Sequence, residues 1–312
     1  MKRHRLPGYA GLLLAAFALL GRGTAAVDGF APRLPLLLGA ALAATVAAVV
    51  EFRALRGADA LAFDRGDAAD FLAVVAGAVL TYWLSVDAGF GPVVASAVVG
   101  LAAGVALPRV DSAAYCGSFV GMVSPAVFPD AGLVVAAGAA AGALFVAARG
   151  AFDGFGGKLG TTAFFGILAV AAGTAAEFAA GTAPPWSEAA LLLPVTAVAA
   201  ALTVALGFRY GLGSVIASAA VGLFGGLVLP MLHPAGDLLA TAAFCATFVG
   251  MVAPARIDGE LRVGAAGALS GAVFLAVSPV FAGAGGKLGT TAFVSCLACY
   301  GVSEGYERLR SP

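Results

Sequence analysis

A nine-residue stretch, GGKLGTTAF, occurs twice without a substitution, at 156–164 and at 285–293. In each copy two glycines precede a lysine, and two threonines follow at the predicted start of an apolar helix. Glycines let the backbone turn tightly and approach a ligand, and the first N–H groups of a helix carry a partial positive charge. Together with a lysine ammonium and threonine hydroxyls, such a corner suits a bound anion.

The predicted binding residues are the glycines, lysines and threonines of both copies: Gly156, Gly157, Lys158, Thr161, Thr162, Gly285, Gly286, Lys287, Thr290 and Thr291. A nucleotide-binding P-loop is excluded, because leucine follows the lysine where serine or threonine is required. The alternative is a structural turn whose lysine reaches the membrane surface. Asp153 could neutralise Lys158, whereas the matching position in the second copy is Ala282, so the two corners would then have unequal roles.

A second repeated motif reads FVGMVSP at 119–125 and FVGMVAP at 248–254. Proline removes a backbone donor and frees carbonyl groups one turn earlier. In lipid these carbonyls need a partner or a polar cavity. We interpret the motif as a broken helix, beside which Ser118 and Thr247 line a solute path. The alternative is a helix that simply ends at the membrane surface.

Residue types that carry out catalysis are sparse. The two histidines, His4 and His233, lie in terminal or connecting segments, and no cluster of His, Cys and Asp offers a metal site. The four cysteines lie in apolar segments, where cysteine behaves as a small hydrophobic residue. No serine or cysteine has an evident base partner. We therefore expect no enzyme activity, no cofactor and no bound metal.

The elements that position these motifs are membrane helices. Of the 312 residues, 61% are hydrophobic and 11% are charged, whereas a soluble domain has about 25% charged residues. The mean hydropathy is +1.01, and apolar stretches of about 20 residues recur along the chain, as needed to cross a bilayer. The formal net charge is zero, so no basic field recruits nucleic acid. The composition predicts an all-α polytopic membrane protein.

The chain also contains an internal duplication. YCGSFVGMVSP matches FCATFVGMVAP at the same offset of 129 residues as the lysine motif, and GFGPVVASAVVGLAAGVALP matches GLGSVIASAAVGLFGGLVLP at an offset of 122. Three matched blocks in one order indicate a duplicated unit. We divide the chain into an N-terminal part at 1–69, with two helices and a cytoplasmic loop, a first repeat at 70–181 and a second repeat at 188–305.

Each repeat has five apolar segments, and two more precede them, which predicts about twelve transmembrane segments. The predicted segments are 8–24, 34–50, 70–86, 89–108, 112–128, 131–148, 159–180, 188–207, 211–230, 238–254, 261–280 and 288–304. The first resembles a signal peptide, and we interpret it as an uncleaved helix. The short segments 112–128 and 238–254 are the uncertain members, because each carries a late proline and a re-entrant path is the alternative to a full crossing.

The distribution of basic residues favours full crossings. With twelve crossings and both termini cytoplasmic, fourteen of the seventeen Lys and Arg residues lie inside. If both short segments were re-entrant, only eleven would lie inside. Five crossings per repeat is an odd number, so the second repeat enters the membrane in the opposite sense. This is an inverted-topology repeat, an architecture that resembles that of many secondary transporters.

These features predict a secondary transporter in the plasma membrane that moves a small polar, anionic solute by alternating access. The alternatives are an anion-selective channel and a non-transporting integral membrane assembly subunit. The expected partners are the solute and the lipid bilayer, together with a second copy of the chain bound through the first two helices.

Overall fold

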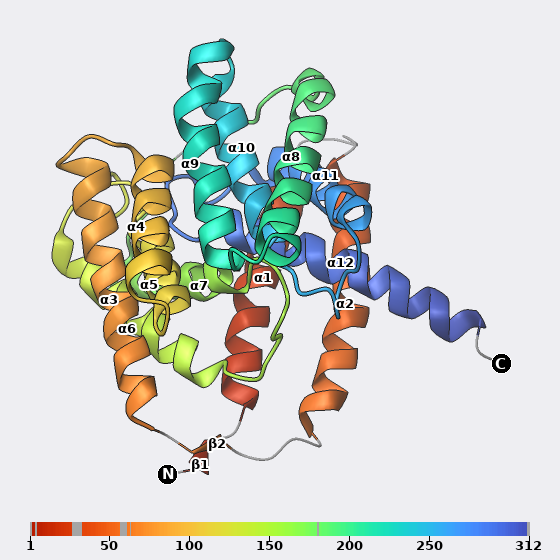
Figure 1. Cartoon of the computed structure of the whole chain (residues 1–312), viewed down its shortest axis with the longest axis horizontal. Helices are drawn as coiled ribbons and strands as arrows, with labels where there is room; N and C mark the ends of the chain where they lie inside the picture. The colour runs from red at the N-terminus through yellow and green to blue at the C-terminus, as the bar shows by residue number, and fades with distance from the viewer. Residues whose placement is uncertain are drawn as a thin grey trace.

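The computed structural model describes residues 2–3, 5–26, 33–56, 61–62, 64–179 and 181–310. Within them the chain forms twelve α-helices and one antiparallel pair of two-residue strands, β1 (Lys2–Arg3) and β2 (Leu61–Ala62). The helical class predicted from the sequence is confirmed. Figure 1 shows vertical helices grouped around α7, with α12 running outward from the middle of the molecule toward the C-terminus.

The helices fall at the predicted apolar segments, one in each. In the first part of the chain they are α1 (Leu6–Ala25), α2 (Arg33–Arg56), α3 (Arg65–Val86), α4 (Pro92–Ala106), α5 (Asp111–Val120), α6 (Ala131–Ala147) and α7 (Lys158–Thr174). In the second part they are α8 (Ala189–Val204), α9 (Ser214–Leu232), α10 (Gly236–Val249), α11 (Glu260–Val277) and α12 (Lys287–Arg310). A 3-10 turn, η1 (Trp186–Glu188), precedes α8, and a π-helical turn, η2 (Ala205–Arg209), follows it.

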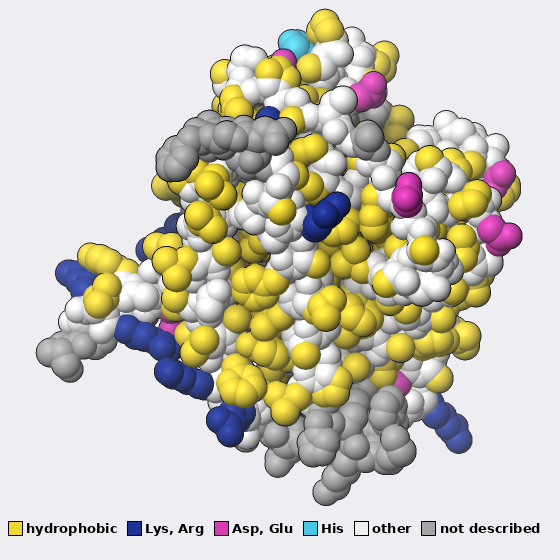
Figure 2. All heavy atoms as spheres, turned by 180° about the vertical axis from the view of Figure 1, so that it is seen from behind, with side chains coloured by type: hydrophobic (Ala, Val, Ile, Leu, Met, Phe, Trp, Pro, Cys, Tyr) yellow, Lys and Arg dark blue, Asp and Glu magenta, His cyan; other side chains and the backbone are white. Residues whose placement is uncertain are grey.

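Six of the described helices are long and apolar enough to cross a membrane. They are α1, α2, α3, the continuous stretch Trp186–Arg209, α9 and α11. Figure 2 shows a broad field of apolar side chains on one face of the molecule, with most charged side chains toward its edges. Leu42, Leu72 and Phe224 are among the large apolar side chains that are exposed on the surface of the molecule. The fold therefore supports an integral membrane protein, and the predicted twelve crossings stay a prediction.

The helix α5 is much shorter than the segment 112–128 in which it lies. It has ten residues and so rises about 15 Å, half of a hydrocarbon core of about 30 Å. It ends at Gly121, and the chain continues through turns past Pro125 before α6 begins. The proline motif therefore follows a helix end. The equivalent α10 ends in the same way at Gly250.

The two repeats use the same helix pairings. In the first repeat α3 packs against α5 and α6, and in the second α8 packs against α10 and α11. Between the repeats α4 packs against α9, and α7 packs against α12. The two N-terminal helices add to both halves, since α1 contacts α7 and α2 contacts α12.

Aromatic side chains fill the centre of the molecule. Tyr115 and Phe119 of α5 meet Phe244 and Phe248 of α10, and all four are buried. The ring centroids of Phe119 and Phe248 are 4.6 Å apart, and those of Phe244 and Phe248 are 4.7 Å apart. Tilted and edge-to-face pairs at such distances add to the energy of burial. The ends of α5 and α10 are thereby packed against each other.

Candidate functional site

The two Gly-Gly-Lys corners are shaped by close contact with the opposite repeat. Gly157 and Gly286, which precede the lysines, have φ values of 80° and 77°, a region that glycine adopts without strain. A side chain on Gly156 would begin 2.5 Å from the carbonyl oxygen of Phe248, and one on Gly285 would begin 2.5 Å from that of Phe119. The glycines are therefore required because each corner presses against the end of α5 or α10 in the other half.

Backbone hydrogen bonds fix the same contacts. The amide of Ser124 donates to the carbonyl of Gly283 at 2.8 Å, and the amide of Ala253 donates to the carbonyl of Gly154 at 2.8 Å. Each turn that follows a shortened helix is thus bonded to the loop that leads into the other repeat's lysine corner. The amides of Ser124 and Ala253, which each precede a proline and lie beyond the end of their helix, find their partners in this way.

The helices that begin at the two lysines cross each other at glycines. A Cβ atom on Gly160 would lie 2.5 Å from the Cα atom of Gly289, and the reverse distance is also 2.5 Å. Gly157 lies against Phe293 in the second turn of α12, and Gly286 lies against Phe164 in the second turn of α7. The start of each helix therefore meets the second turn of the other.

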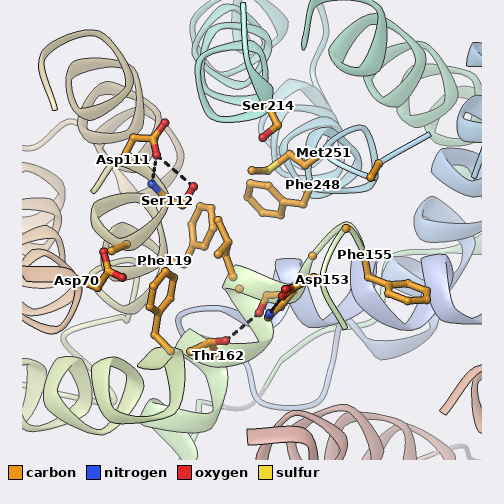
Figure 3. Close-up of a pocket in the computed structure, with 18 of the residues that line it drawn as sticks. Asp70, Asp111, Ser112, Phe119, Asp153, Phe155, Thr162, Ser214, Phe248 and Met251 are labelled. Carbon is orange, nitrogen blue, oxygen red and sulfur yellow. Dashed lines mark hydrogen bonds and ion pairs between the residues drawn. The ribbon is translucent and has the colours of Figure 1, made fainter. Parts of the chain in front are cut away.

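A cavity of about 460 Å³, cavity 1, opens above the first corner (Figure 3). Its floor includes Gly157, Lys158 and Thr162, and Phe119 and Phe248 form part of its wall. The charged residues that also line it are Asp70, Arg109, Asp111, Arg149 and Asp153.

A smaller cavity of about 270 Å³, cavity 2, lies at the second corner. Many residues that line cavity 2 are the repeat equivalents of residues that line cavity 1. Gly283, Gly286, Lys287, Met122, Phe274 and Thr241 correspond to Gly154, Gly157, Lys158, Met251, Phe145 and Ser112. Lys287 is the one charged side chain among the described residues that line it. The structure thus brings each predicted lysine to a cavity of its own.

The two lysines have different partners. The Lys158 ammonium donates to the carbonyl of Ala148 at 2.9 Å and to the carboxylate of Asp153 at 2.5 Å. The Lys287 ammonium donates to the carbonyl of Ser278 at 2.8 Å and forms no ion pair within the described part of the chain. Its side chain is buried. One corner is therefore neutralised by a carboxylate and the other is not.

The four threonines of the corners use their hydroxyl hydrogens within their own helices. Thr161 and Thr290 donate to the carbonyls of Gly157 and Gly286, at 3.1 and 3.2 Å. Thr162 and Thr291 likewise donate to the carbonyls of the lysines four residues earlier, at 3.0 and 3.1 Å. Of these four threonines, only Thr162 lines one of the two cavities.

Ser118 and Thr247 lie in a buried hydroxyl cluster instead of at either cavity. Ser118 bonds to the hydroxyl of Ser96 at 2.8 Å and to the carbonyl of Tyr115 at 2.7 Å. Thr247 bonds to the hydroxyl of Ser218 at 2.9 Å, and Tyr115 also reaches Ser218, at 3.0 Å. These hydroxyls connect α4 and α5 to α9 and α10 at the interface of the repeats.

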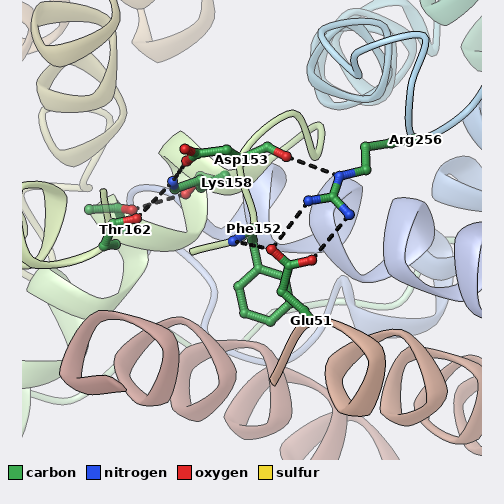
Figure 4. A network of polar contacts seen from close by, with 7 residues as sticks. Glu51, Phe152, Asp153, Lys158, Thr162 and Arg256 are labelled. Carbon is green, nitrogen blue, oxygen red and sulfur yellow. Dashed lines mark hydrogen bonds and ion pairs between the residues drawn. The ribbon is translucent and has the colours of Figure 1, made fainter. Parts of the chain in front are cut away.

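A buried ionic network beside cavity 1 was missed by the sequence reasoning (Figure 4). The carboxylate of Glu51, on α2, accepts bonds from the Arg256 guanidinium at 3.1 and 3.2 Å and from the amide of Phe152 at 3.0 Å. Arg256 also donates to the carbonyl of Asp153 at 3.1 Å and lies 4.5 Å from the ring centroid of Phe155. The sequence contains a signal for this network, because Arg256 lies two residues after Pro254 of the proline motif, whereas its equivalent in the first repeat is Val127.

A second ionic contact holds the loop before the first corner. Arg149 donates to the carboxylate of Asp67 at 2.6 Å, and Asp67 in turn caps the start of α3 together with Asp64. The hydrogen bond to Asp67 raises the pKa of the Arg149 guanidinium, and the nearby carboxylates add to this effect. The loop 148–157 is thereby tied to both α2 and α3.

Comparison of the chain with models of protein families, with curated proteins and with solved structures finds no match. No group of three or more metal-ligating side chains occurs among the residues that the structure describes.

Proposed function

We propose that this chain is a secondary transporter that carries a small anion across a membrane by alternating access of two inverted repeats. The observation that carries the proposal is the setting of Lys287, the one charged side chain on the described lining of cavity 2. A buried ammonium without a carboxylate is costly, and an anion bound beside it would offset that cost. Lys158 occupies the equivalent place beneath cavity 1.

The crossing of α7 and α12 supports the inverted arrangement. The start of α7 contacts the second turn of α12, and the start of α12 contacts the second turn of α7, as the contacts of Gly157 and Gly286 indicate. The two helices therefore run antiparallel where they cross. A pseudo-twofold axis between Gly160 and Gly289 would exchange the two repeats. Transporters with inverted repeats have such an axis in the membrane plane and bind their substrate near it.

The contacts of the ionic residues agree with the sides assigned from the distribution of Lys and Arg. Arg256 pairs with Glu51, and Arg149 pairs with Asp67, and the topology puts all four on the cytoplasmic side. Cavity 1 is lined by Arg149 and other residues assigned inside, and cavity 2 by the corner around Lys287, which is assigned outside. We therefore propose that cavity 1 opens to the cytoplasm and cavity 2 opens to the exterior.

The path of the segment 112–128 supports a full crossing. Asp70, near the start of α3, and Asp111, at the start of α5, both line cavity 1. At the other end of α3, Tyr82 donates to the carbonyl of Phe128 at 2.8 Å. The segment thus runs parallel to α3 along most of its length, although only its first part is helical. We therefore propose that this segment crosses the membrane together with α3, in line with the twelve crossings predicted from the sequence.

Alternating access would exchange the two cavities across the packed centre. The glycine crossing and the rings of Phe119 and Phe248 separate the two corners. Cavity 1, at about 460 Å³, is the larger, and cavity 2, at about 270 Å³, the smaller. In the proposed cycle the repeats exchange conformations, so that cavity 2 widens as cavity 1 contracts.

Flux into proteoliposomes tests the proposal. The purified chain is reconstituted, and uptake of chloride, nitrate, acetate and inorganic phosphate is measured with and without the same anion trapped inside. A transporter gives saturable uptake that the trapped anion accelerates. A conductance that does not saturate would replace the transporter with an anion channel. No flux of any of these anions would remove the proposal and favour a non-transporting subunit.

A further inference from the structure

We propose that Asp153 is a built-in competitor for the anion at Lys158, and that it weakens anion binding in cavity 1 relative to cavity 2. This inference rests on the proposed function, because it assigns a role to a residue beside the anion site. It concerns a charged residue that bonds to the lysine at the first corner and is replaced by Ala282 at the second.

The position of the Asp153 carboxylate is that of a ligand. It lies 2.5 Å from the Lys158 ammonium, and both residues line cavity 1. The Asp153 side chain is 64% exposed, whereas that of Lys158 is 17% exposed. The carboxylate therefore lies on the open side of the lysine, where an anion entering from cavity 1 would arrive.

The backbone around Asp153 is anchored at several points, whereas its side chain is held by Lys158 alone within the described residues. Its carbonyl accepts a bond from Arg256 at 3.1 Å, and the neighbouring carbonyl of Gly154 accepts one from Ala253 at 2.8 Å. On the other side, the amide of Phe152 is bonded to Glu51 at 3.0 Å. Within the described residues the carboxylate itself bonds to Lys158 alone. It can leave by rotation of the side chain, and the anchored backbone keeps it near the lysine at a high effective concentration.

The second corner shows the arrangement of the lysine in the absence of a competing carboxylate. The position equivalent to Asp153 is Ala282, and Lys287 bonds to the carbonyl of Ser278 without an ion pair in the described chain. An alanine is therefore compatible with the fold of such a corner. An anion binding at Lys287 displaces no carboxylate, whereas one binding at Lys158 must displace Asp153.

Competition by a half-exposed ion pair has a modest size. Such pairs contribute up to about 1 kcal/mol, which corresponds to about a fivefold change in a binding constant. Removing the carboxylate also removes its repulsion of the anion. We therefore expect Asp153→Ala to tighten anion binding in cavity 1 by about fivefold.

The experiment isolates each corner with the opposite lysine replaced. The full-length protein in detergent is titrated with chloride, nitrate, acetate or inorganic phosphate at constant ionic strength, and thermal stability is recorded, because a ligand stabilises the state that binds it. In the Lys287→Met background, Asp153→Ala and Asp153→Asn should lower the half-saturating concentration about fivefold. In the Lys158→Met background, Ala282→Asp should raise it about fivefold.

An unchanged or higher half-saturating concentration in the Asp153 variants would overturn the inference and leave the proposed transport function standing, provided that the wild-type protein still responds to anions and shows flux. If no anion stabilises the wild-type protein and none is transported, the proposed function fails, and the inference fails with it. A fivefold decrease that persists when Lys158 is also replaced would show that Asp153 acts on some other group, which again overturns the inference.

Discussion

Gly160 and Gly289 face each other where α7 crosses α12, so closely that a Cβ atom on either would lie 2.5 Å from the Cα atom of the other. No side chain separates the two helices at this point. The crossing is a direct contact between the first repeat and the second. Small residues at such crossings let backbones approach in a membrane, where the hydrophobic effect does not drive helices together.

Replacement of Gly160 or Gly289 by alanine should therefore push the helices apart. We expect a loss of about 1–3 kcal/mol in the free energy of unfolding, the usual cost of overpacking a well-packed interior. Gly173→Ala on the same helix is the matched control, because nothing lies within 4 Å of a Cβ atom built there. Thermal unfolding in detergent measures both. Equal stability of Gly160→Ala and Gly173→Ala would contradict the tight crossing.

The two lysines should be needed for anion transport. Lys158→Met and Lys287→Met each keep an unbranched side chain of nearly the same length and remove the positive charge, so we expect each to reduce anion flux at least about tenfold, with no saturable flux left in the double variant. Proteoliposome uptake is the measurement, and Arg308→Met, at the half-exposed end of α12, serves as the control for loss of a positive charge. Saturable transport by the double variant would refute the lysine assignment.

The proposed inverted topology predicts different sides for equivalent residues of the two repeats. Pro129 and Asp258 are both exposed and are related by the repeat offset, and the predicted topology puts the first outside and the second inside. In a background without the four native cysteines, a membrane-impermeant thiol reagent added outside cells should label Pro129→Cys and not Asp258→Cys. The lysine positions give a second comparison, in which a reagent small enough to enter cavity 2 should reach Lys287→Cys from outside and not Lys158→Cys. Equal labelling of the members of each pair would rule out the inverted arrangement.

The buried pair of Glu51 and Arg256 should contribute far more to stability than a surface pair. The two side chains are only 5% and 22% exposed, and removal of one partner from such a pair costs about 3–5 kcal/mol. Glu51→Ala should therefore lower the free energy of unfolding by about 3 kcal/mol. Glu260→Ala is the comparison, because the pair of Glu260 with Arg209 lies at the surface and its loss costs at most about 1 kcal/mol. Similar values for the two variants would show that the Glu51 network is not a structural anchor.

Much of the helical framework could be predicted from the sequence, because the length of an apolar run and the positions of Gly and Pro depend on neighbouring residues alone. The predicted segment 112–128 was too long for a helix, since the backbone leaves the helical path at Gly121 before Pro125 is reached. The predicted segment 159–180 was also too long, because α7 ends before Ala175, which adopts a left-handed conformation.

The candidate site could be predicted only in part. The repeated corner identified Lys158 and Lys287, but a repeat does not reveal which residues of the other half lie against it. The pairing of Glu51 with Arg256 joins positions 205 residues apart, and no periodicity in the sequence connects them. The cavities arise from the same long-range packing, so neither their volumes nor the partners of the lysines follow from local pattern.

The backbone bonds from Ser124 to Gly283 and from Ala253 to Gly154 have a consequence for biosynthesis. When the first repeat leaves the ribosome, the amide of Ser124 and the carbonyl of Gly154 have no partners, because Gly283 and Ala253 both belong to the second repeat, which is synthesised later. These backbone hydrogen bonds of the nascent first half therefore form only after the second half has been inserted. Either half synthesised alone would be a substrate for quality-control proteases, and two separately synthesised halves would survive only by finding each other.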